Sequence, residues 1–150
     1  MAVIGPTLAT HDFEPAARRH HEDAIHLCHH ERYASADHLA GFAAECALKA
    51  LLVGFLGVSA PSRGYPSDAQ GNRFGHLPGL WRQAELSAQG RVGARFLTLL
   101  TGTNPFLKWD VSDRYSDGSS ITAGRAWAHI AAAGALVKIQ ERAKVFGAVP

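Results

Sequence analysis

The residues from Ser35 to Leu56 constrain the fold most, because they are apolar around almost the whole circumference of a predicted helix. A helix of this kind is either central to its domain or shared with a partner chain. Its many alanines would let neighbouring helices approach closely. One face of the predicted helix is formed by Leu39, Phe42, Ala43, Cys46, Ala50 and Val53.

Helical spacing of apolar residues also predicts helices over residues 14–32 and 120–146, with shorter helical pieces at 76–86 and 92–100. Pro15 is favoured at the first position of a helix. No useful length of sequence alternates apolar and polar residues as a strand would. We therefore expect an all-α fold, an up-and-down bundle of four to five mostly antiparallel helices. The 150 residues form a single domain, with its helical core at about 14–146.

Composition excludes several classes of protein. The chain has 15 basic and 13 acidic residues, a net charge of +2, which gives no strong electrostatic case for duplex DNA or an anionic membrane. Cys28 and Cys46 form no metal or redox motif and suit a reducing compartment. Residues 1–9 lack the basic start of a secretion signal, and the longest apolar stretch contains Glu45 and Lys49. We expect a cytoplasmic protein without a membrane span.

Two irregular stretches, 57–75 and 101–120, interrupt the helices, and connections of such length are often functional. The second gathers cationic, acidic and aromatic residues, a mixture that would hold a phosphate and stack a base, or would equally pin the loop to the bundle. Its candidate ligand-binding residues are Lys108, Trp109, Asp113, Arg114 and Tyr115, beside Asp110. Arg63, Tyr65, Arg73 and His76 would join them if the first stretch folds toward the second.

Two charges on the apolar helix are further candidates for ligand binding. Glu45 and Lys49 lie four residues apart, which predicts either an ordinary ion pair or a partly buried site. His38, seven residues before Glu45, would extend the same polar stripe.

Arg125 and His129 also lie four residues apart, near the start of the last predicted helix, and so face the same way. An arginine that grips phosphate beside a histidine that moves a proton is a workable catalytic pair for cleaving RNA. Both residues are equally compatible with a place at the surface or the edge of the core.

Five histidines crowd the first predicted helix. Glu22, His26 and His30 recur every four residues on one face, a spacing open to a metal ion but more typical of a solvated polar face. His21, Glu22 and His26 do not form the HExxH zinc motif. We predict no resident metal and no cofactor.

The segment Arg19–Leu52, with AxHLAGFAAECALKALL on its second helix, resembles the HEPN superfamily of small helical proteins. The His76-Leu77-Pro78-Gly79-Leu80 element and the loop before the last helix add to the similarity, which spans most of residues 14–146. The resemblance implies a homodimeric helical bundle. Many HEPN members are metal-independent ribonucleases of toxin–antitoxin or related systems. Others bind nucleotides or accompany a nucleotidyltransferase partner protein.

The sequence thus favours an HEPN-like binding or regulatory module for a nucleotide or single-stranded RNA. The ribonuclease members carry an arginine and a histidine with wider spacing than Arg125 and His129, which have three residues between them. A metal-independent endoribonuclease using this pair is therefore the alternative. There Arg125 would steady the phosphate and His129 would act as the general base. A structural dimerisation protein is a second alternative.

Overall fold

The computed structural model describes residues 11–55, 58, 65–87, 100 and 102–146. They form the helices α1 (Phe13–His29), α2 (Tyr33–Phe55), α3 (Gly79–Ser87) and α5 (Ala123–Phe146), with a short 3-10 helix, η1, at Val111–Tyr115. No strand occurs among these residues, although an isolated antiparallel bridge joins Ser67 to Arg73. The prediction of an all-α fold is confirmed. The predicted helix at 92–100 and Arg63 lie outside the described residues, except for Leu100.

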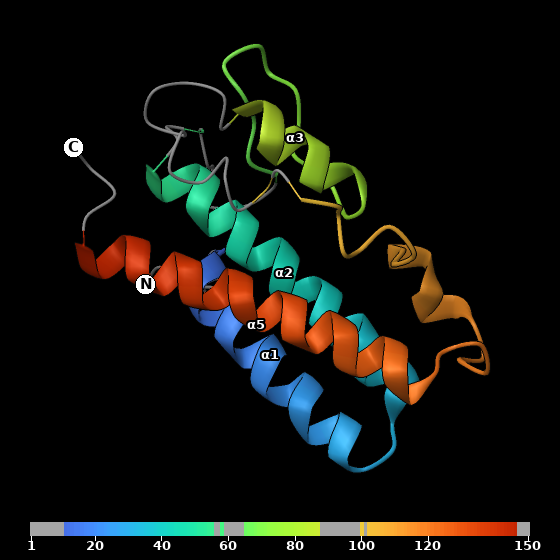
Figure 1. Ribbon diagram of the computed structural model, residues 1–150. Coiled ribbons are helices and arrows are strands. Elements are labelled where there is room, and N and C mark those ends of the chain that lie inside the picture. Colours follow the sequence, from blue (N-terminus) through green and yellow to red (C-terminus); the bar gives the residue numbers. More distant parts are fainter. Residues whose placement is uncertain (1–10, 56–57, 59–64, 88–99, 101, 147–150) are drawn as a thin grey trace, which may run out of the picture.

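The centre of the fold is α2, which packs along its length against both α1 and α5 (Figure 1). α3 lies over the C-terminal half of α2, and the segment with η1 lies beside its N-terminal half. Alanines make much of the contact, which lets the helix axes approach closely. Those fully buried along α2 are Ala36, Ala40, Ala43, Ala44 and Ala47. The uniformly apolar character of α2 therefore reflects a position between neighbouring helices of the same chain.

A tight turn at residues 30–32 reverses the chain between α1 and α2. Glu31 adopts a left-handed backbone conformation with a φ of 59°, and the backbone N–H of Arg32 donates to Leu27 O at 2.9 Å. α1 therefore runs antiparallel to α2, whereas α2 and α5 run in the same direction (Figure 1). The expectation of mostly antiparallel helices is therefore correct for α1 with α2 and for α1 with α5, but it is wrong for α2 with α5, which are parallel.

Polar contacts fix α1 against α5. The Arg18 guanidinium lies 3.1 Å from Glu141, and Lys144 lies 2.8 Å from Glu14. Nearer the middle, His21 Nε2 donates to the backbone oxygen of Ile130 at 3.1 Å. Within the described part of the chain, no helix is long and apolar enough to cross a membrane.

Candidate functional site

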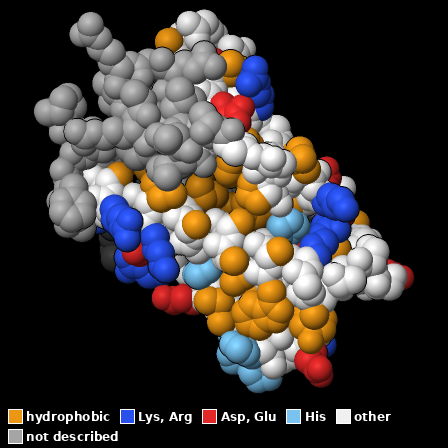
Figure 2. Space-filling model, viewed as in Figure 1, with side chains coloured by type: hydrophobic (Ala, Val, Ile, Leu, Met, Phe, Trp, Pro, Cys, Tyr) orange, Lys and Arg blue, Asp and Glu red, His pale blue; other side chains and the backbone are white. Residues whose placement is uncertain are grey.

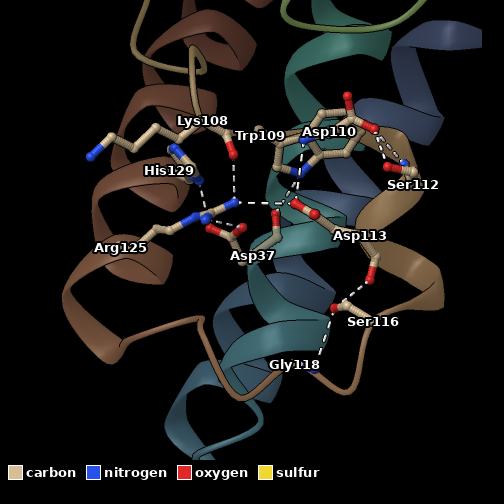
Figure 3. Close-up of polar contacts among 10 residues, drawn as sticks. All are labelled: Asp37, Lys108, Trp109, Asp110, Ser112, Asp113, Ser116, Gly118, Arg125 and His129. Carbon is tan, nitrogen blue, oxygen red and sulfur yellow. Dashed lines mark hydrogen bonds and ion pairs between the residues drawn. The ribbon is translucent and has the colours of Figure 1, made fainter.

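Asp37, a carboxylate near the start of α2, binds both Arg125 and His129 of α5 (Figure 3). Its Oδ1 accepts a hydrogen bond from His129 Nδ1, and its Oδ2 lies 3.3 Å from Arg125 Nε. Asp37 is 1% exposed and His129 is 5% exposed. A carboxylate buried this deeply needs charged or hydrogen-bonding partners to offset its lost hydration. The expectation that Arg125 and His129 share one face is confirmed.

Arg125 also ties the loop before α5 to this carboxylate. Its Nη2 donates to Lys108 O at 2.8 Å and lies 3.2 Å from Asp113 Oδ2. The ring of Phe106 stacks on His129 with the centroids 5.1 Å apart. The pair proposed for catalysis therefore joins three segments of the chain. His129 Nδ1 and Arg125 Nη2 are hydrogen bonded to protein groups, and Arg125 Nε lies within ion-pair distance of Asp37.

Trp109 anchors the segment that carries most of the predicted ligand-binding residues. The ring is 1% exposed, stacks on His38 with a centroid separation of 5.2 Å, and donates from Nε1 to the backbone oxygen of Asp37 at 3.1 Å. A Cβ atom at Gly41 would lie 1.9 Å from this ring, so the close approach requires glycine there. Trp109 holds the loop to α2 by burial and presents no open face for stacking a base.

After Trp109 the backbone turns into η1 through a capping box. Ser112 N donates to Asp110 Oδ1 at 2.7 Å, and Asp110 N donates to Asp113 Oδ2 at 3.4 Å. Hydrogen bonds from the Ser112 hydroxyl and backbone hold the pKa of Asp110 below its usual range. The local sequence thus fixes the direction of Asp113 toward Arg125 and leaves Arg114 and Tyr115 exposed.

A groove of about 680 Å³ lies between the α1–α2 turn and η1. Arg32 and Arg114 reach it from these two segments, and Tyr33 and His38 contribute rings. Arg114 lies over the Tyr115 ring at 4.8 Å. Among the described residues, neither arginine forms an ion pair with a carboxylate.

Three carboxylates also line this groove, namely Glu31, Asp113 and Asp117. Asp113 is paired with Arg125, and Asp117 accepts hydrogen bonds from Ser119, whose backbone and hydroxyl lower the pKa of that carboxyl. The groove therefore holds two arginines without an ion pair and two carboxylates, Glu31 and Asp117, that no described cation neutralises.

A second carboxylate–histidine pair forms where α2 meets the start of α3. Glu45 is 3% exposed and accepts hydrogen bonds from Leu77 N at 2.9 Å and from His76 Nδ1 at 3.0 Å. The His76 side chain is 36% exposed, so this imidazole reaches the surface while the carboxylate stays beneath it. His76 also belongs to the turn that begins α3, because Leu80 N donates to its backbone oxygen at 2.9 Å.

Lys49, one turn after Glu45, is buried between aromatic rings. Its Nζ lies 5.6 Å from the centroid of the Tyr65 ring and 6.0 Å from that of Phe13. Burial lowers the pKa of this amine, and burial also raises the pKa of the neighbouring Cys46 thiol to about 11. Among the ion pairs of the described residues none joins Glu45 to Lys49, so the expected pairing is not formed.

Most of the predicted site residues fall into two groups, one at each of two carboxylates of α2. Asp113, Arg125, His129 and the backbone oxygen of Lys108 gather around Asp37, whereas Tyr65, Arg73, His76 and Lys49 lie near Glu45. Arg114 and Tyr115 belong to neither group and are exposed at η1. Sequence reasoning missed Asp37. Asp37 is a carboxylate within the apolar helix, and the same feature had identified Glu45 as a candidate.

The histidines of α1 do not assemble into a metal site. The rings of His26 and His30 lie 4.5 Å apart, and His30 Nδ1 donates to the backbone oxygen of His26 at 2.9 Å. In the described ranges, no three His, Cys, Asp or Glu side chains are grouped so that they would hold a metal ion.

Comparison with known proteins yields no relative. No family model matches the chain, no curated protein matches it, and no solved structure matches it.

Proposed function

We propose that this protein is a binding or regulatory module that takes a nucleotide or the end of a single-stranded RNA in the groove between the α1–α2 turn and η1. The unpaired guanidinium groups of Arg32 and Arg114 are the observation that carries this proposal. Arginine binds phosphate through charge-assisted hydrogen bonds. The guanidinium of Arg114 lies over the Tyr115 ring, and these two flat groups are suited to stacking with a base.

The weak overall charge fits a small ligand better than a long duplex. Basic side chains on the face seen in Figure 2 gather in small separate groups, and some lie next to acidic ones. A duplex-binding protein instead presents a continuous basic surface, because many phosphates must be neutralised together. One or two phosphates require only the two arginines of the groove.

Binding of a fluorescently labelled single-stranded hexaribonucleotide tests the proposal. Arg114→Ala is expected to raise the Kd by about tenfold or more, the loss expected from a charged hydrogen bond. Arg142→Ala removes the same charge from an exposed position near the far end of α5 and is the matched control. Equal effects of the two variants, or no binding by the wild type, would exclude the groove as the site.

Endoribonuclease activity at Arg125 and His129 is the less favoured proposal. Catalysis requires groups aimed at the substrate, but His129 is 5% exposed, and Asp37, Lys108 O and Asp113 engage its Nδ1 and the Nε and Nη2 of Arg125. RNA cleavage in EDTA, by untagged wild type and an Arg125→Lys/His129→Gln variant of confirmed helicity, tests it. Cleavage by the wild type alone would support catalysis there, and absence of cleavage would support the binding module.

The remaining proposals follow from the resemblance. We propose an HEPN-like bundle of four to five helices that forms a homodimer, acts in the cytoplasm and works with a cognate partner, such as a toxin–antitoxin or nucleotidyltransferase component. The packing of α2 between α1 and α5 supports a helical bundle. Analytical ultracentrifugation of the purified chain measures the oligomeric state, and a monomer at micromolar concentration would exclude the homodimer.

A further inference from the structure

The pair formed by Glu45 and His76 has the geometry of an activated imidazole. An ionised carboxylate only accepts hydrogen bonds, so the contact of Glu45 with Nδ1 places the proton on that nitrogen. The neutral ring then carries its lone pair on Nε2, to which no described residue is hydrogen bonded. Since the side chain is 36% exposed, the lone pair belongs to a ring that solutes reach.

Two cations without carboxylate partners surround the neighbouring Tyr65 ring. The Arg73 guanidinium lies 5.9 Å from its centroid and Lys49 Nζ lies 5.6 Å from it, while the His76 ring meets it edge-on at 6.2 Å. In the described part of the chain, neither cation forms an ion pair. Tyr65 thus contacts both His76 and two cations, which offset the negative charge of Glu45, in contact with His76, and of Asp110, which interacts with it electrostatically.

We infer that His76 is a nucleophile whose Nε2 accepts a phosphoryl group from a small activated phosphoryl donor. This inference goes beyond the proposed function and does not depend on the groove, which His76 does not line. Histidine is an established type of covalent nucleophile, and a carboxylate on its second nitrogen orients the ring and offsets the charge that develops on it.

The step balances without a metal or redox partner. With phosphoramidate as donor, the Nε2 lone pair of His76 forms a new bond to phosphorus. The bond between phosphorus and the amine nitrogen of phosphoramidate breaks, and its electron pair stays on that nitrogen. Ammonia leaves after taking a proton from solvent, and the Nδ1 proton stays hydrogen bonded to Glu45. Arg73 would neutralise charge on the phosphoryl oxygens, the usual contribution of arginine to phosphoryl transfer.

Phosphorylation of the full chain by phosphoramidate, with each histidine quantified by mass spectrometry under conditions that preserve phosphohistidine, tests the inference. His76 is expected to react about tenfold faster than His26, His29 and His30, which are exposed but bind no carboxylate. Glu45→Gln is expected to remove this preference, because its amide would donate to Nδ1 and move the ring proton to Nε2. A rate at His76 no higher than at the α1 histidines would overturn the inference.

A surface variant keeps the test decisive if Glu45→Gln fails to fold. Arg73 is exposed, and Arg73→Ala is expected to slow phosphorylation of His76 by about threefold or more through loss of the neighbouring cation. Arg82→Ala removes another exposed arginine, one that is paired with Glu85 on α3, and is expected to leave the rate unchanged. Equal rates in the two variants would contradict a role for Arg73 and overturn the proposed site.

Discussion

The two carboxylate–histidine pairs of α2 use similar chemistry in opposite surroundings. Asp37 and His129 are both buried, and Arg125 and Phe106 cover the pair. At the second pair the carboxylate of Glu45 is buried, but the His76 ring lies at the surface. The contacts around each pair, and not the residue types within it, determine what each can do.

This difference separates a structural role from a chemical one. Around Asp37, each charge is used to hold α2, α5 and the loop before α5 together. Around Glu45, the carboxylate fixes a loop and orients a ring that is 36% exposed. The second nitrogen of neither His76 nor His129 is hydrogen bonded in the described part of the chain, but His129 is only 5% exposed. Variants that compare the two pairs therefore test the account.

Asp37→Ala is expected to have the largest effect on stability. Removing the central carboxylate of a buried cluster takes away the hydrogen-bond acceptor of His129 and one of the two carboxylates that pair with Arg125, which costs about 3–5 kcal/mol. Glu45→Ala is expected to cost about 1–3 kcal/mol, because it leaves one buried backbone N–H while His76 gains water. Urea denaturation followed by circular dichroism measures both values. If Glu45→Ala loses as much free energy of unfolding as Asp37→Ala, or more, the distinction between a structural pair and a chemical pair is contradicted.

Gly41→Ala is expected to destabilise the protein next most strongly. Gly41 lies between the two carboxylates on α2, and its added Cβ would overlap Trp109, which covers the Asp37 pair. Overpacking of this kind costs about 1–3 kcal/mol. Gly54→Ala is the matched control, because a Cβ there meets nothing within 4 Å and alanine favours a helix. If both variants have the stability of the wild type, Trp109 does not anchor the loop.

The smallest expected effect is the pH dependence of stability due to His38, an α2 histidine to which no described residue is hydrogen bonded at either ring nitrogen. Burial lowers its pKa, so the folded state binds a proton at His38 less tightly than the unfolded chain, which takes one up near the ordinary value of 6.5. Stability is therefore lost as pH falls below that value, by at most about 1.4 kcal/mol per pH unit for one proton.

His38→Phe keeps a ring against Trp109 and is expected to reduce this loss between pH 7.5 and 5.5. Urea denaturation at each pH measures the slope. His20, whose pKa burial also lowers, contributes with the same sign and leaves part of the dependence in the variant. An unchanged or steeper slope would show that His38 does not enter the acid sensitivity.

Helices could be predicted from the sequence, but their partners could not. The last helix was expected at 120–146 and occurs at Ala123–Phe146, because apolar spacing along one segment determines its helical character. The first ends earlier than expected, at His29, because Glu31 takes a left-handed conformation that no pattern before the turn indicates.

The candidate sites were only partly predictable for the same reason. The spacing of four residues correctly predicted that Arg125 and His129 lie together. It could not indicate Asp37, which belongs to another helix and lies 92 residues before His129. The same rule failed for Glu45 and Lys49, because His76 and Leu77 N reach the carboxylate from a distant segment. Local spacing identifies residues on one face, whereas tertiary packing selects the pairs.

Carbethoxylation of the native protein by diethyl pyrocarbonate at neutral pH, with the rate at each histidine measured by mass spectrometry, tests the distinction between the two pairs most directly. The account predicts modification of His76 about tenfold or more faster than that of His129, since the reagent needs an accessible, unprotonated nitrogen. Modification of both histidines at the same rate, or of His129 first, would contradict it.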